Sequence, residues 1–197
     1  DFKQDIPALI PVTRRHYREV GFVYICNPNN PTGVVVPKQD IKQLLDGIPE
    51  DTPVLIDEAY HHFVQDPNYG PSAQYVLEGR PVVIARTFSK IFGIAAMRLG
   101  YAIAPPALVA KMGATLQLLS GGRFILGMGA GWHEEEYRAY GYDFPPAGAR
   151  VAQLDEALRV VKALWTQERA TFEGRHYRLR DARCEPRPDP VPPVLVG

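Results

Sequence analysis

The chain has 197 residues, which suffices for one domain or two small ones. Its 22 basic and 22 acidic residues give a formal net charge of zero, which argues against partners held by bulk charge, such as nucleic acid or an anionic membrane. No apolar run approaches the roughly 18 residues of a membrane-spanning helix, and Cys26 and Cys184 form no Cys-x-x-Cys motif. We therefore expect a cytoplasmic protein with reduced thiols and no metal site.

The first half of the sequence alternates between predicted strands and helices. A helix is expected over residues 12–19, and short apolar runs predict buried strands at 22–26, 53–56 and 82–85. Apolar residues at helical spacing predict a helix after Pro37, and a shorter helix is expected over 72–78. This alternation is typical of a parallel sheet. A further strand is predicted at 99–104.

Polar motifs follow each of the first three strands. They read NPNNPTG over residues 27–33, DEAY over 57–60 and RTFSK over 86–90. A lysine just past a buried strand, here Lys90, lies where α/β sheets bind ligands and is a candidate for covalent chemistry with a carbonyl group. Taken alone, a Ser-Lys pair after a strand is more often a solvated loop.

Together these motifs resemble the large domain of the fold-type I pyridoxal-phosphate aminotransferases, with the histidinol-phosphate branch nearest. The resemblance covers residues 1–105 and is most specific over 21–105. It rests on Asn-Pro-Thr-Gly, Asp-x-Ala-Tyr and Thr-x-Ser-Lys, followed by Arg98, in this order and spacing. It implies that the strand at 99–104 runs antiparallel to the three before it.

The resemblance also implies a role for each motif residue around pyridoxal phosphate. Lys90 would bind the cofactor as an internal aldimine, and Asp57 would pair with the protonated pyridine nitrogen. The other implied contacts are to the phenolic oxygen (Asn30 and Tyr60) and to the phosphate (Thr87, Ser89 and Arg98).

We nevertheless expect no enzymatic turnover. The sequence given does not contain the family's glycine-rich phosphate loop, the aromatic residue that stacks on the pyridine ring, or the arginine that binds the substrate carboxylate. An active site needs such supporting groups. Lys90 is therefore interpreted as a vestigial catalytic residue, and no resident cofactor is expected. Residual pyridoxal-phosphate binding at Lys90 is the alternative.

The second half resembles a different family. Helices are predicted over 107–119 and 150–165, and strands over 124–127 and 194–196. The strand lead-in Leu-Ser-Gly-Gly-Arg-Phe at 119–124, with the rest of 107–197, resembles the middle of the luciferase-like flavin or deazaflavin monooxygenases. That family is a TIM barrel, which implies that its successive strands are parallel.

Three other patterns give no strong functional signal. The glycines at 127, 129 and 131 do not match a dinucleotide loop, because Trp132 occupies the position of the third glycine; close packing at a strand end is favoured. His133 and the glutamates at 134–136 lack metal-ligand spacing and predict a solvated helix start. His61 and His62 are expected in a loop or on the surface.

We predict a single chimeric α/β domain over residues 1–197. An aminotransferase-derived fragment (1–105) and a barrel-derived fragment (106–197) would be spliced at a strand–helix unit that both parents share. The expected fold is a three-layer sandwich: a single mixed sheet of about six strands in sequential order, three in each direction, with helices on both faces. Barrel closure is not expected from such a sheet.

Three functions remain open from the sequence. The first is an engineered scaffold without a complete active site. The second is an aminotransferase-like protein that binds pyridoxal phosphate, and the third is a flavin-binding oxidoreductase fragment. A truncated sheet leaves edge strands, so a homodimer through an exposed edge or an apolar surface is a further expectation.

Overall fold

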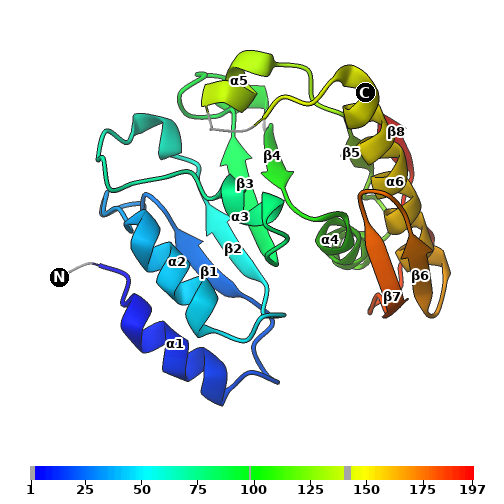
Figure 1. The fold of residues 1–197 in the computed structure, drawn as a ribbon, viewed down its shortest axis with the longest axis horizontal. Helices are drawn as coiled ribbons and strands as arrows, with labels where there is room; N and C mark the ends of the chain where they lie inside the picture. Colours follow the sequence, from blue (N-terminus) through cyan, green and yellow to red (C-terminus); the bar gives the residue numbers. More distant parts are fainter. Residues whose placement is uncertain (1–2, 98, 140–142) are drawn as a thin grey trace. The chain divides into compact units, whose positions relative to one another are not determined.

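The computed structural model describes residues 3–97, 99–139 and 143–197. It divides the chain into two compact units, Asp1–Pro105 and Pro106–Gly197, termed here the N-terminal and C-terminal units (Figure 1). Within the described ranges, no helix combines the length and the hydropathy needed to cross a membrane.

The N-terminal unit is built on a mixed sheet of four strands in sequential order. The strands are β1 (Val23–Cys26), β2 (Val54–Asp57), β3 (Val82–Thr87) and β4 (Gly100–Ile103). The first three are parallel, and β4 pairs antiparallel with β3. The predicted strand order and directions are therefore confirmed for this unit.

One face of this sheet forms the core of the unit. Side chains alternate between the two faces of a strand, and every second residue of β1 and β2 is almost fully buried, as Ile25 and Ile56 illustrate with 0% exposure. By contrast, Tyr24 is 50% exposed on the other face. The apolar side chains on this side of the sheet point toward the helices.

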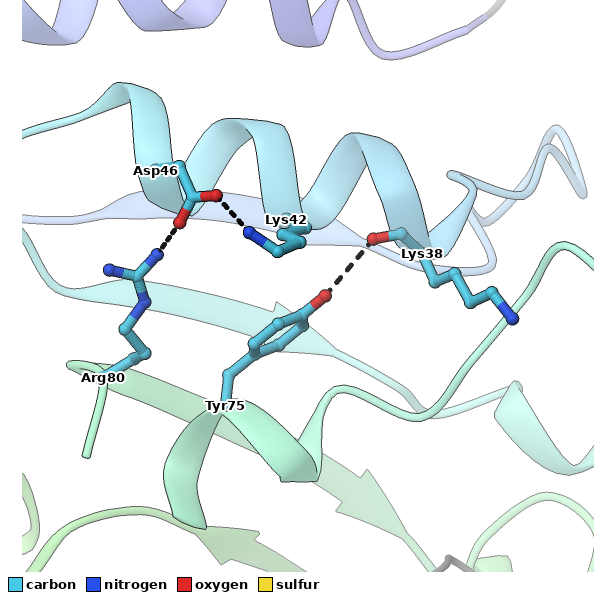
Figure 2. Close-up of polar contacts among 5 residues, drawn as sticks. All are labelled: Lys38, Lys42, Asp46, Tyr75 and Arg80. Carbon is cyan, nitrogen blue, oxygen red and sulfur yellow. Dashed lines mark hydrogen bonds and ion pairs between the residues drawn. The ribbon is translucent and has the colours of Figure 1, made fainter. Parts of the chain in front are cut away.

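Three helices pack side by side over this buried face. They are α1 (Ile6–Arg15), α2 (Lys38–Gly47) and α3 (Ala73–Leu77), and two single 3₁₀ turns, η1 (His61–Phe63) and η2 (Ala95–Met97), lie in the loops. Figure 2 shows how α2 and α3 are joined: the Tyr75 hydroxyl donates to the carbonyl of Lys38 at 3.2 Å, and Asp46 pairs with both Lys42 and Arg80.

The helix positions correct the expectation of helices on both faces. Parallel strands in sequential order, joined by right-handed crossovers, place successive helices on the same side of a sheet. Helices α2 and α3 are two such crossovers, and α1 packs beside α2. Within residues 3–97 and 99–105, the three helices therefore cover one face, and the other face carries Tyr24, Cys26 and Asp57.

In the C-terminal unit, residues 106–139 and 143–197 form three helices and four short strands. Helix α4 (Pro106–Leu119) and the long α6 (Ala147–Thr166) confirm the two predicted helices, and α5 (Glu134–Ala139) lies between them. Strands β5 (Leu126–Met128) and β8 (Val194–Val196) form a parallel pair, as predicted. Strands β6 (Ala170–Glu173) and β7 (Arg178–Ala182) form an antiparallel hairpin.

Trp165 of α6 organises the core of the C-terminal unit. It is 1% exposed and donates its indole N–H to the carbonyl of Ala110 at 2.8 Å. A Cβ at Gly113 would lie 2.7 Å from the Trp165 ring and 3.1 Å from the Phe124 ring, which is too close for a side chain. The glycine therefore lets α4 approach α6.

The single six-stranded sheet expected from the sequence is not found among the described residues. The strands form one sheet of four and two of two. Strand β5 pairs with β8 in the register Leu126↔Val194, and β4 pairs only with β3. Strand pairing among the described residues thus stays within each of the two units.

The hairpin β6–β7 was not predicted from the sequence, because its strands alternate only weakly between apolar and polar residues. Its turn is fixed by a charged group instead. The Glu156 carboxylate of α6 accepts hydrogen bonds from three successive backbone N–H groups, those of Arg175, His176 and Tyr177, at 2.8–3.1 Å. These bonds lower the pKa of Glu156, against the opposing effect of desolvation.

Candidate functional site

The predicted site residues lie at the carboxyl edge of the parallel strands. Asp57 is the last residue of β2, and the segments that follow β1 and β3 carry Asn30 and Lys90. Because the carboxyl ends of parallel strands meet at one edge of a sheet, the topology gathers these segments there. Cys26 and Asp57 are paired in register, as are Asp57 and Ala85.

The loop after β1 is held by a buried asparagine. Asn27 is 1% exposed; its amide nitrogen donates to the carbonyl of Val36 at 3.0 Å, and its amide oxygen accepts from the Val36 N–H at 2.9 Å. Within the loop, the Gly33 N–H donates to the Asn29 carbonyl at 2.7 Å. Gly33 has a φ of 69°, which favours glycine. These bonds fix the loop that presents Asn30.

Asn30, Tyr60 and Lys90 form a cluster. The Asn30 amide nitrogen lies 3.5 Å from the Tyr60 hydroxyl, and the Lys90 Nζ lies 5.0 Å from the centroid of the Tyr60 ring. Lys90 and Asn30 are exposed, and Tyr60 is partly buried. The structure thus brings together an amine, an amide and a phenol from three different loops.

The turn that carries Lys90 is fixed by rings and by a glycine. Phe88 contacts Tyr101 of β4 and Phe92, with centroids 5.3 and 5.4 Å apart. The Gly93 N–H donates to the Lys90 carbonyl at 3.0 Å, and Gly93 has a φ of 67°. This arrangement places the Lys90 backbone firmly while its amine stays exposed.

Asp57 is held by two hydrogen bonds. Its Oδ1 accepts from the Ala59 N–H at 3.0 Å, and its Oδ2 accepts from the Tyr24 hydroxyl at 3.0 Å. The carboxylate is partly buried. Asp57 is therefore fixed in orientation, with one lone pair on each oxygen left for a further donor.

Of the predicted phosphate contacts, Thr87 and Ser89 lie in one turn. The Thr87 hydroxyl donates to the Leu99 carbonyl at 3.3 Å and accepts from the Ser89 N–H at 3.0 Å. Thr87 thus closes the turn that leads to Lys90. Arg98, the third predicted phosphate contact, lies outside the described residues.

A buried ion pair beneath this edge was not predicted from the sequence. Glu58 is 0% exposed and Arg86 is 4% exposed, and Glu58 Oε2 accepts from Arg86 Nε at 3.0 Å and from its terminal nitrogen at 2.8 Å. Glu58 Oε1 accepts from the Ser72 N–H at 2.8 Å. In the sequence, the pair is indicated only by one charged residue in each of the DEAY and RTFSK motifs, which follow buried strands. The pair joins β2, β3 and α3 beneath the loops that carry Tyr60 and Lys90.

A shallow cavity of about 430 Å³ opens beside the cluster. It lies between the loop after β1 and the segment after η1, and its walls include Asn30, Tyr60, Phe63 and Asp66. It therefore shares two of its residues with the predicted cofactor contacts. No group of three or more His, Cys, Asp or Glu side chains suited to a metal ion occurs in the described ranges.

His61 lies in a loop, which is one of its two expected positions, but it is buried there and not on the surface. It is 6% exposed in η1, and its ring lies 3.8 Å from that of His62. Burial lowers the pKa of His61 from 6.5 to about 3, with smaller effects from the charges of Arg86 and His62. The imidazole is therefore neutral in the folded protein near neutral pH.

This shift predicts that acid weakens the N-terminal unit. Between pH 6.5 and 3 the unfolded chain binds a proton at His61 that the folded chain does not, so the free energy of unfolding falls as the pH falls. The expected slope is up to about 1.4 kcal/mol per pH unit. Urea unfolding of wild type and His61→Gln at several pH values measures it, with the exposed His16→Gln as control. An equal slope in His61→Gln would contradict this assignment.

Two families match this sequence. Aminotransferase class I and II matches residues 1–120, and luciferase-like monooxygenase matches residues 62–197. Histidinol-phosphate aminotransferase 2 of Legionella pneumophila subsp. pneumophila is 45% identical over 92 residues, which is 47% of this chain and 25% of that protein. The aromatic amino acid aminotransferase of Thermobifida fusca is 43% identical over 94 residues, 48% of this chain and 26% of that protein.

A solved structure also matches about half of this chain. A putative histidinol-phosphate aminotransferase from Erwinia carotovora atroseptica SCRI1043 superposes with a TM-score of 0.52 at 38% identity. The superposition covers 55% of this chain and 32% of that one. The chain spans about a quarter of the length of the curated relatives it matches.

Proposed function

Because the chain belongs to the class I and II aminotransferases over residues 1–120 and to the luciferase-like monooxygenases over residues 62–197, we propose that it is a chimeric scaffold with a residual pyridoxal-phosphate site. The site would bind the cofactor without completing transamination. We propose further that the fusion is engineered, since the two matches overlap within residues 62–120 and no linker separates them.

The observation that carries the proposal is the Asn30–Tyr60–Lys90 cluster. Its donor set fits the cofactor: an exposed amine that can react with an aldehyde, and an amide and a phenol able to hydrogen-bond a phenolic oxygen. Asp57, fixed at the neighbouring strand end, would accept from the pyridine nitrogen. Bound pyridoxal phosphate supplies an electron sink for carbanion chemistry.

The expected lack of turnover has a physical basis in the same site. Lys90 and Asn30 are exposed, so water reaches the amine and weakens every electrostatic contact made there. Thr87 already uses its hydroxyl within its own turn.

A titration with pyridoxal phosphate tests the proposal. We expect a saturable absorbance change, and a covalent adduct trapped by borohydride that peptide mapping assigns to Lys90. Lys90→Ala should weaken binding by about tenfold or more, which corresponds to about 1.4 kcal/mol. The exposed Lys162→Ala on α6 is the matched control and should bind as wild type does.

Two results would contradict the proposal. Equal labelling of Lys90→Ala and wild type would show non-specific modification of surface amines. Lys90-dependent transamination of an amino acid donor would show a functional enzyme. The same titration with FMN tests the flavin-binding alternative, which rests on the family match alone.

We also propose that the chain can form a homodimer through the outer edge of β1. Along that edge the side chain of Gln4 already engages the backbone of Cys26: Nε2 donates to the carbonyl at 2.6 Å, and Oε1 accepts from the N–H at 3.3 Å. This contact occupies one of the pairing positions, so a second copy that pairs there would have to displace it. Light scattering of the titrated samples measures the molar mass, and a mass that rises toward that of two chains with concentration is expected.

A further inference from the structure

Tyr24 joins β1 to the carboxylate at the end of β2. Successive residues of a strand point to opposite faces. Tyr24 therefore shares a face with Cys26, which is paired in register with Asp57. A tyrosine two residues back on the neighbouring strand can reach such a diagonal partner. The observed distance from the Tyr24 hydroxyl to Asp57 Oδ2 is 3.0 Å.

We propose that Tyr24 is a positioning residue of the cofactor site, which holds the Asp57 carboxylate in the orientation that receives the pyridine nitrogen. This inference rests on the proposed function. The Ala59 N–H binds Oδ1 and the Tyr24 hydroxyl binds Oδ2, so both oxygens are anchored and the carboxylate plane cannot rotate freely. Tyr24 acts through Asp57 and does not itself contact the cofactor.

The phenol is suited to this role across the neutral pH range. Partial burial raises the pKa of Tyr24, and the neighbouring Cys26 and Asp57 raise it further. Tyr24 thus remains a neutral donor in this pH range, where an anion would repel the carboxylate. The face of the sheet that carries it is the one that α1, α2 and α3 do not cover, so its bond with Asp57 is made at the surface of the unit.

Tyr17 provides a matched control. Its hydroxyl also bonds to a carboxylate, that of Asp51, and both side chains are exposed. Tyr17 follows α1 and Asp51 precedes β2, so this pair lies away from the carboxyl edge. Removing either hydroxyl deletes one tyrosine–aspartate hydrogen bond, but only one of the two aspartates is a cofactor contact.

The experiment is a double-mutant cycle of Tyr24→Phe and Asp57→Asn on pyridoxal-phosphate affinity and on the pH dependence of the bound cofactor's absorbance. We expect Tyr24→Phe to weaken binding about threefold to tenfold, which corresponds to about 0.7–1.4 kcal/mol. The absorbance profile should shift in the direction that Asp57→Asn gives. In the Asp57→Asn background, Tyr24→Phe should have no further effect. Tyr17→Phe should match wild type in both measurements.

Two outcomes overturn the inference alone. In the first, Tyr24→Phe binds as wild type does, with an unchanged absorbance profile. In the second, Tyr24→Phe weakens binding equally with and without the Asp57 carboxylate, which would show that it acts independently of Asp57. Failure of the proposed function is recognised separately, because wild type itself then shows no saturable binding, and that result overturns both.

A titration without cofactor tests the hydrogen bond directly. Carbon-13 labelling of the tyrosine ring carbon that bears the hydroxyl reports each of the 10 tyrosines by NMR, and the signal lost in Tyr24→Phe identifies Tyr24. Asp57→Asn should lower the pH at which this phenol ionises, while Asp51→Asn should not. An unchanged Tyr24 titration in Asp57→Asn would overturn the inference.

Discussion

Glu58→Ala is expected to lower the free energy of unfolding of the N-terminal unit by about 3–5 kcal/mol. The substitution leaves the Arg86 guanidinium buried, at 4% exposure, without the carboxylate that receives two of its hydrogen bonds. It also removes the acceptor of the Ser72 N–H at the start of α3. Burial alone would lower the pKa of Arg86. The negative charge of Glu58 outweighs this effect, so the pKa of Arg86 is raised.

The measurement is urea unfolding followed by far-UV circular dichroism. Glu78→Ala, an exposed glutamate just after α3, is the matched control and should change the free energy of unfolding by no more than about 0.5 kcal/mol. The double variant Glu58→Leu/Arg86→Met should be far more stable than Glu58→Ala, because no buried charge remains. A Glu58→Ala protein as stable as the control would contradict the buried pair.

The same samples test the predicted single domain. Trp132 and Trp165 are the only two tryptophans, and both belong to the C-terminal unit. Fluorescence therefore reports that unit, while Glu58→Ala weakens the other. A coincident shift of both transitions is expected of one cooperative domain. A fluorescence transition that stays at the wild-type midpoint would mean that the two units unfold separately.

Much of the N-terminal unit was predictable because its signals are local. Each strand is a short apolar run, each helix carries an apolar face, and the polar motifs follow the strands in an order that resembles one family. The placement of Asn30, Asp57 and Lys90 at one sheet edge followed from parallel topology alone. The direction of β4 came from the family resemblance, since no local pattern encodes whether a strand runs parallel or antiparallel.

The features that the sequence did not predict depend on contacts between residues far apart in the chain. Whether β4 pairs with β5 depends on a register that the helix between them does not encode, and the hairpin β6–β7 depends on a carboxylate from α6. His61 was expected in a loop or on the surface, and its burial in η1 depends on tertiary contacts that no local pattern around it encodes. Tyr24 was read as one residue of an apolar strand, although its hydroxyl reaches the predicted cofactor site.

Trp165→Ala is expected to have an effect of similar size in the C-terminal unit, about 3–5 kcal/mol. The ring is 1% exposed and packs against the bare backbone of Gly113, so its loss opens a cavity that a rigid pair of helices cannot close. The substitution also leaves the Ala110 carbonyl without the indole N–H, which donates at 2.8 Å. Trp132→Ala, in which an 82% exposed ring is removed, is the matched control and should have an effect below about 0.5 kcal/mol.

The contact with Gly113 can be tested separately by a second substitution. Gly113→Ala alone should destabilise the unit, because its Cβ would lie 2.7 Å from the Trp165 ring, even though alanine favours a helix by about 1 kcal/mol over glycine. In a Trp165→Leu background the clash is relieved, and Gly113→Ala should become neutral or stabilising. Urea unfolding followed by circular dichroism measures all four proteins of this cycle. Equal effects of Gly113→Ala in both backgrounds would show that the glycine is not what admits the tryptophan between α4 and α6.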